Sequence, residues 1–209
     1  DHGFWLASAV FDGARALAGA VPDLERHCQR LIKSGQLMSM QPSITAEKIV
    51  TLVWDGIAKF PSVSELYICP ILYPTGGFIT PEPESTEFIL HVGESPLPPP
   101  DGFAACWSSF RRPARDMAPT EAKASCLYPN VARSVQEANE KGFDTGIVID
   151  PIGNIAEFSY ANEIDTVTYS TSGNTLTIID EESFDIDYTV SQSDLVLVDG
   201  DSQDTSMIV

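Results

Sequence analysis

The sequence has no Lys, Arg or His after residue 162. Residues 163–209 hold 11 of the 30 acidic side chains, and the whole chain of 209 residues carries a formal net charge of −18. A protein that binds nucleic acids neutralises their phosphates with Lys and Arg. The acidity therefore argues against nucleic-acid binding, and the change in charge near Asn162 predicts a boundary in the chain.

Other signatures are missing as well. The four cysteines form no Cys-x-x-Cys pair and the three histidines are scattered, so we expect no metal site and reduced thiols of a cytoplasmic protein rather than a disulfide framework. No signal peptide and no apolar run of 18 residues is present, so we expect no membrane partner.

The sequence does contain enough apolar residues for a core, at 43% of the chain. Its apolar spacing predicts helices over 24–31 and 43–60, the second capped by Ser43 or Thr45 and stopped by Pro61. Strands are predicted over 65–72, 87–92 and 103–110. The proline-rich stretch 95–102 between the last two strands is typical of a stiff connector.

The segment from Lys123 to Asn162 has the clearest local pattern. A helix is expected from Pro129, with its apolar face on one side and Gly142 after its last turn. Strands are expected over 146–150 and 155–158, joined by the turn 151–154. A helix that leads into a hairpin can bring Lys123 and Glu157 into one cleft.

Such a pair has a chemical meaning. A desolvated lysine forms a Schiff base readily, and pyridoxal phosphate binds proteins in this way, with an acid opposite its ring nitrogen. On spacing alone, however, a Lys and a Glu 34 residues apart are more often two unrelated surface charges.

The sequence around these residues resembles that of the fold-type IV pyridoxal-phosphate aminotransferases, the branched-chain amino-acid aminotransferase group. The matching runs are Lys123–Tyr128, Glu137–Asp144, Ile147–Asp150 and Glu157–Asn162. The resemblance implies pyridoxal 5′-phosphate as cofactor. It also implies that Lys123 is the catalytic Schiff-base lysine, that Tyr128 lies beside the cofactor and that Glu157 meets its pyridine nitrogen.

The N-terminal part resembles the same family. Residues 10–15 read Val-Phe-Asp-Gly-Ala-Arg, which implies that Phe11 contacts the substrate side chain; from the residues alone, Phe11 is equally well ordinary core. Tyr67 matches a tyrosine that helps to hold substrate carboxylates, whereas Cys69 stands where the family has an arginine.

The family's phosphate-binding arginine is also replaced, here by Asp23. Arg26 at the start of the same helix is the expected substitute in cofactor binding, and Arg30 is expected on a solvated helix face. Arg112 matches a further family arginine, for which we expect a role in orienting its loop through backbone hydrogen bonds.

After Asn162 the resemblance ends. A repeat of period 19 relates Tyr169–Asp180 to Tyr188–Asp199, each copy reading as strand, turn and strand. We therefore expect a mixed α+β or α/β fold in three parts: a small α/β domain over 1–95 that is incomplete at its N-terminus, the first part of a cofactor-binding large domain over 96–162, and an appended acidic β-meander with a tail over 163–209.

The resemblance implies a homodimer that transfers an amino group between a hydrophobic, branched-chain-like amino acid and a 2-oxo acid. Because the family's phosphate-binding run after Asn162 is absent here, we expect slow turnover. The alternatives are an inactive, aminotransferase-like binding or interaction chain and, among enzymes, a D-amino-acid aminotransferase or an aminodeoxychorismate lyase.

Overall fold

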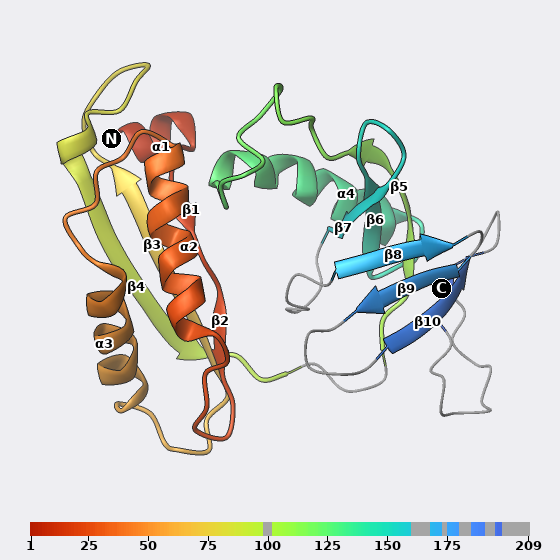
Figure 1. Cartoon of the computed structure of the whole chain (residues 1–209), viewed down its shortest axis with the longest axis horizontal. Helices are drawn as coiled ribbons and strands as arrows, with labels where there is room; N and C mark the ends of the chain where they lie inside the picture. The colour runs from red at the N-terminus through yellow and green to blue at the C-terminus, as the bar shows by residue number, and fades with distance from the viewer. Residues whose placement is uncertain (98–101, 160–167, 173–174, 180–184, 191–194, 198–209) are drawn as a thin grey trace. The chain divides into compact units, whose positions relative to one another are not determined.

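The computed structural model describes residues 1–97, 102–159, 168–172, 175–179, 185–190 and 195–197, with side chains as far as Ser159 (Figure 1). The chain forms two compact units. Unit 1 comprises 1–98 and 113–129, and unit 2 comprises the described residues of 99–112 and 130–209. By its contacts, the segment with Lys123 thus groups with the N-terminal residues, whereas the boundaries at 95 and 162 remain a prediction from the sequence.

Unit 1 is built on an antiparallel sheet around β3 (Leu66–Pro74). β4 (Thr86–Glu94) pairs with one edge of β3, and β1 (Val10–Phe11) and β2 (Ala14–Ala16) pair with the other. β1 and β2 keep one register, with Val10 opposite Leu72 and Ala14 opposite Ile68. They are therefore one strand, interrupted at Asp12 and Gly13.

Helices α2 (Leu24–Leu37) and α3 (Ala46–Ile57) lie on one face of this sheet (Figure 1). As predicted, Thr45 caps α3, its Oγ1 accepting the N–H of Lys48. α2 runs two turns beyond the predicted residue 31, through the buried Gly35, where a Cβ would come within 3.1 Å of the Leu72 side chain. The core between helices and sheet contains Val10, Leu24, Leu31, Ile49, Val53, Leu66, Ile68 and Leu72.

Three short helical segments complete unit 1. They are α1 (His2–Leu6), which precedes β1, and the 3₁₀ turns η1 (Pro83–Ser85) and η2 (Ser125–Leu127). The turn η2 begins two residues after Lys123 and leads into α4.

Unit 2 contains a sheet with the order β5 (Ala105–Arg111), β6 (Thr145–Ile149) and β7 (Ile155–Phe158), in which β5 and β6 are parallel and β6 and β7 antiparallel. α4 (Tyr128–Glu140) precedes β6, and Gly142, at a φ of +83°, follows its end. The helix and the hairpin that the sequence predicted are therefore confirmed, with bounds shifted by one or two residues.

The match to the family motif that begins at Glu137 has a structural explanation. The Glu137 carboxylate accepts the Ser109 N–H of β5 at 2.8 Å and the Lys141 ammonium at 2.8 Å. These hydrogen bonds, that from Lys141 first, lower the pKa of Glu137 to about 2. Glu137 therefore ties α4 to β5 rather than taking part in chemistry.

The last strands, β8 (Thr168–Ser172), β9 (Thr175–Ile179), β10 (Asp185–Val190) and β11 (Leu195–Leu197), form an antiparallel sheet in chain order. This is the meander that the repeat predicted, and its predicted turns lie outside the described residues. Within the described part of the chain, no helix has the length and apolar character needed to cross a membrane.

Candidate active site

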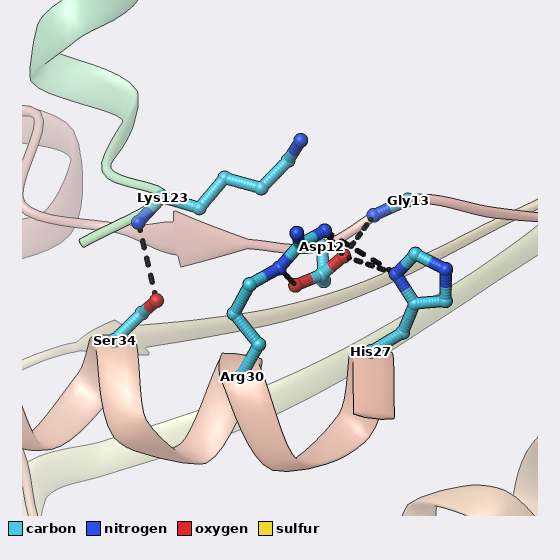
Figure 2. A network of polar contacts seen from close by, with 6 residues as sticks. All are labelled: Asp12, Gly13, His27, Arg30, Ser34 and Lys123. Atoms are coloured by element: carbon cyan, nitrogen blue, oxygen red, sulfur yellow. Dashed lines mark hydrogen bonds and ion pairs between the residues drawn. The ribbon is translucent and has the colours of Figure 1, made fainter. Parts of the chain in front are cut away.

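The backbone of Lys123 is held by β1. The Phe11 N–H donates to the Lys123 carbonyl at 3.1 Å, and the Ser125 N–H donates to the Ala9 carbonyl at 2.9 Å, on either side of the antiparallel bridge between Val10 and Ala124. In a regular antiparallel pair, the Lys123 N–H would donate in turn to the Phe11 carbonyl. The buried Ser34 hydroxyl of α2 accepts it instead, at 3.1 Å (Figure 2).

The side chain of Lys123 lies beside an aromatic ring of unit 1. Its Nζ lies 5.6 Å from the centroid of the Phe11 ring, within the range of a cation–π contact. The Phe11 and Tyr128 rings pack with their centroids 4.9 Å apart. The structure thus brings together three residues that the sequence assigned to one site, namely Phe11, Lys123 and Tyr128.

Tyr67 shares a sheet face with Phe11. Side chains alternate along strands, and the registers place Phe11 opposite Ile71 and Arg15 opposite Tyr67. Phe11, Tyr67 and Cys69 therefore lie on the face away from the core. The Phe11 ring contacts Lys123 on this face. The role of Tyr67 in substrate binding remains a prediction.

Arg26 is largely exposed, with Nε 3.6 Å from Asp23 Oδ1, and its predicted contact with a phosphate remains a prediction. Arg30, by contrast, does not simply line a solvated face as expected. Its Nε and Nη2 donate to the two oxygens of Asp12, each at 2.7 Å (Figure 2). Sequence reasoning missed this pair.

Asp12 is a completely buried acid on the core side of the interrupted strand. Its carboxylate lies 2.9 Å from His27 Nδ1 and accepts the N–H of Gly13, in addition to the two bonds from Arg30. Burial raises the pKa of Asp12, but the hydrogen bonds and positive charge of Arg30 and His27 outweigh burial, so that the pKa is lowered from 3.8. Asp12 is therefore a carboxylate near neutral pH.

The charge of Asp12 also affects the pKa of a neighbouring thiol, that of Cys28. Burial, followed by the charges of Asp12 and Glu25, raises the pKa of Cys28 to about 11. Cys28 is consequently protonated and inert near neutral pH. Among the described residues, no group of three or more His, Cys, Asp and Glu side chains has the geometry to hold a metal ion.

Glu157 belongs to unit 2 and lies on β7. Its Oε1 accepts a hydrogen bond from Arg112 Nη1 at 2.7 Å, and both side chains are about one-third exposed. Arg112 follows β5, and its backbone N–H donates to Ile149 of β6, so its side chain reaches across the central strand to β7. We expected Arg112 to orient its loop; the structure adds an ion pair with the predicted cofactor residue.

Lys123 and Glu157 lie in different units, and the expectation that they share one cleft therefore remains a prediction. Each unit contains one of these two predicted residues, with its own support. Lys123 is fixed by β1 and α2 in unit 1, and Glu157 is fixed by Arg112 in unit 2.

Comparison with known proteins identifies relatives over the same residues. The family model described as Amino-transferase class IV matches residues 9–164, a span that includes Phe11, Lys123 and Glu157. A probable branched-chain-amino-acid aminotransferase of Rickettsia bellii is 27% identical over 164 residues, which cover 77% of this chain and 56% of that protein. The chain thus spans about half the length of the curated relatives that it matches.

Solved structures of aminotransferases also resemble this chain. An aminotransferase from Brucella abortus, bound to the cofactor PLP, is 38% identical with a TM-score of 0.75, over 84% of this chain and 62% of that chain. The branched-chain amino acid aminotransferase from Escherichia coli is 24% identical with a TM-score of 0.69, over 84% and 58% of the two chains. These likenesses confirm the expected mixed fold.

The lowered pKa of Asp12 predicts a pH-dependent contribution to stability. A depressed folded-state pKa stabilises the protein above the unfolded-state value near 3.8 and loses this effect as the pH falls through the folded-state value. Asp12→Asn should lower the free energy of unfolding by about 1.5–3 kcal/mol at pH 7, the typical contribution of a charged hydrogen bond. The difference from the unmodified chain should shrink below pH 3.8.

Urea unfolding followed by circular dichroism from pH 3 to pH 7 measures this difference. Asp55→Asn, a change at an exposed acid of α3, is the matched control and should leave the free energy of unfolding unchanged at each pH. A difference for Asp12→Asn that stays constant through the acid range would contradict the assignment of the charge.

Proposed function

Because the chain belongs to the class IV aminotransferases, we propose that it is a cytoplasmic, pyridoxal-phosphate-dependent enzyme that transfers an amino group between a branched-chain-like hydrophobic amino acid and a 2-oxo acid. The observation that carries the proposal is the support of Lys123. Its backbone is bound on both sides by β1 and Ser34, and its amine lies beside the Phe11 ring, which packs in turn on Tyr128.

The residues present fit this cofactor by their chemistry. An aldehyde requires a primary amine, which Lys123 supplies, and the half-buried position of Lys123 beside Phe11 shields that amine in part from water. A pyridine nitrogen that carries a proton requires a carboxylate. Glu157 supplies one, with Oε1 bound to Arg112 and Oε2 accepting no hydrogen bond from a described residue.

When bound, pyridoxal 5′-phosphate supplies an aldehyde carbon and an electron-withdrawing ring. Lys123 Nζ would hold the cofactor at its aldehyde carbon. When it is not bonded to the cofactor, the same atom would be the base that accepts and returns the proton of the amino acid's α-carbon. Arg112 orients Glu157, so that its second oxygen can hold a proton donor in place.

The substrate side chain would pack on the face that carries Phe11 and Tyr67. Cys69 lies on this face where the family has an arginine, and a thiol does not replace a guanidinium that binds a carboxylate through two hydrogen bonds. This substitution supports an amino acid with an apolar side chain. Arg26 is the proposed contact of the cofactor phosphate.

We predict that Lys123 is the residue that binds the cofactor covalently. Purified protein mixed with pyridoxal 5′-phosphate should gain a visible absorption band, and borohydride should fix the cofactor on Lys123, because its backbone is held by β1 and Ser34 and its amine lies beside the Phe11 ring. Peptide mass mapping locates the label. Lys33→Ala, a change at an exposed lysine of α2, is the control and should label as the unmodified chain does. Label found on Lys33 or Lys59 alone would rule out the proposed role.

Amino transfer itself is tested in a single turnover, which detects a slow enzyme. Protein loaded with cofactor and given L-leucine should release the corresponding 2-oxo acid, measured by mass spectrometry. Lys123→Arg should slow the release about 100- to 10,000-fold, the usual contribution of general acid–base catalysis. Release from D-leucine alone would instead support a D-amino-acid aminotransferase, and release from neither would support a binding chain.

The proposed enzyme is a homodimer, which an exposed apolar surface of unit 1 supports. Phe4 and Trp5 of α1 are 90% and 70% exposed, and Phe78 in the loop 76–81 is 75% exposed. His2 Nε2 lies 3.4 Å from the Ile79 carbonyl, which joins α1 to that loop. Apolar surface of this kind is typical of an interface.

Light scattering measures the association. The mass should be twice the 22.7 kDa of the chain, and Trp5→Ser combined with Phe78→Ser should shift it towards one chain because these changes remove apolar area from the interface. Val63→Ser is the matched control, a change at another apolar residue that is 85% exposed. A single-chain mass for the unmodified protein would exclude the dimer.

A further inference from the structure

Asp12 lies one residue beyond the strand that holds Lys123, yet the proposed chemistry does not use it. Its position in the sheet explains why it needs its own partners. The Asp12 N–H donates to the Pro70 carbonyl of β3, and Pro70 has no N–H to return. The pairing of the interrupted strand with β3 is therefore weakened at this residue.

On the other edge of the strand, the backbone pairing with the Lys123 segment ends at Phe11, just before Asp12. Along an antiparallel strand, backbone groups point to alternate edges, so the Gly13 N–H points to the same edge as the Phe11 N–H that binds Lys123. The Lys123 segment has already turned towards Ser34. The Asp12 carboxylate accepts the Gly13 N–H at 2.9 Å, and thereby satisfies the first backbone donor beyond the end of the pairing.

One face of α2 binds both Asp12 and the backbone of Lys123. His27, Arg30 and Ser34 are spaced at i, i+3 and i+7, which places them on the same side of the helix. His27 and Arg30 bind Asp12, whereas Ser34 binds the Lys123 N–H (Figure 2). The Asp12 contacts therefore set the separation of β1 and α2 at the point where both elements hold Lys123.

We propose that Asp12, held by Arg30 and His27, is a positioning residue for Lys123: it fixes β1 against α2 so that Phe11 and Ser34 together hold the lysine backbone. The inference rests on the proposed role of Lys123. Proton transfer and covalent bond formation require reacting atoms at close range, and a misplacement of about 1 Å can cost roughly 100-fold in rate. Asp12 thus acts on the reaction through Lys123 and touches no reacting atom.

The first test uses amide hydrogen exchange in the chain without cofactor. Asp12→Asn should speed the exchange of the Phe11 and Lys123 amides about 10-fold more than it speeds exchange in the β3–β4 ladder, whose amides report only the loss of global stability, because a local opening exposes only the bonds that it breaks. Arg30→Lys keeps the charge but loses the two-pronged contact, and should give an intermediate effect. Asp55→Asn is the matched control.

The second test follows the rate at which pyridoxal 5′-phosphate and borohydride label Lys123, with Lys33 as the internal reference. The ratio of the two labelling rates should fall about 10- to 100-fold in Asp12→Asn, less in Arg30→Lys and not at all in Asp55→Asn. Arg30→Lys gives the same comparison if Asp12→Asn fails to fold.

Three outcomes overturn the proposal: unchanged exchange at Phe11 and Lys123, an equal rise of exchange throughout the β3–β4 ladder, or local exchange that rises while the labelling ratio stays the same. Failure of the proposed function looks different. In that case Lys123 takes no label in the unmodified chain either, although Asp12→Asn still speeds exchange at Phe11 and Lys123.

Discussion

The strand β1 is only two residues long, and it forms backbone hydrogen bonds along both of its edges. On one edge its residues pair with β3, the central strand of unit 1, and on the other they pair with the segment around Lys123. A lysine that is 112 residues away in sequence is in this way added to the sheet by main-chain hydrogen bonds. Its location consequently depends on the backbone of β1.

This arrangement explains why a buried charge is retained in unit 1. A strand with partners on both edges cannot easily shift, yet the break at Asp12 and Gly13 leaves a donor to satisfy at the place where one partner departs. A buried carboxylate is costly unless it is paired and hydrogen-bonded. Arg30 and His27 meet both conditions from α2, and the side chain of Arg30 stays partly exposed, which limits the cost of burying the pair.

The elements, and the grouping of Lys123 with Phe11 and Tyr128, were predictable from sequence because both leave local patterns. Apolar periodicity and caps gave α3, α4, β6 and β7, and the motif around Lys123 indicated its neighbour Tyr128. The Arg30–Asp12 pair was not predicted, because it joins residues of two elements that meet only after folding. One signal was available: Asp12 interrupts an alternation of core residues that continues with Ala14 and Ala16, and an acid at such a position requires a partner.

The motif that runs continuously from Lys123 to Glu157 is divided between two units in space, and the division has a physical consequence. The chain leaves unit 2 after Arg112, supplies Lys123 to unit 1 and returns at Asn130. The amine and the carboxylate are therefore each oriented within their own unit, Lys123 by Phe11 and Ser34 and Glu157 by Arg112. Neither group has to be ordered by the other.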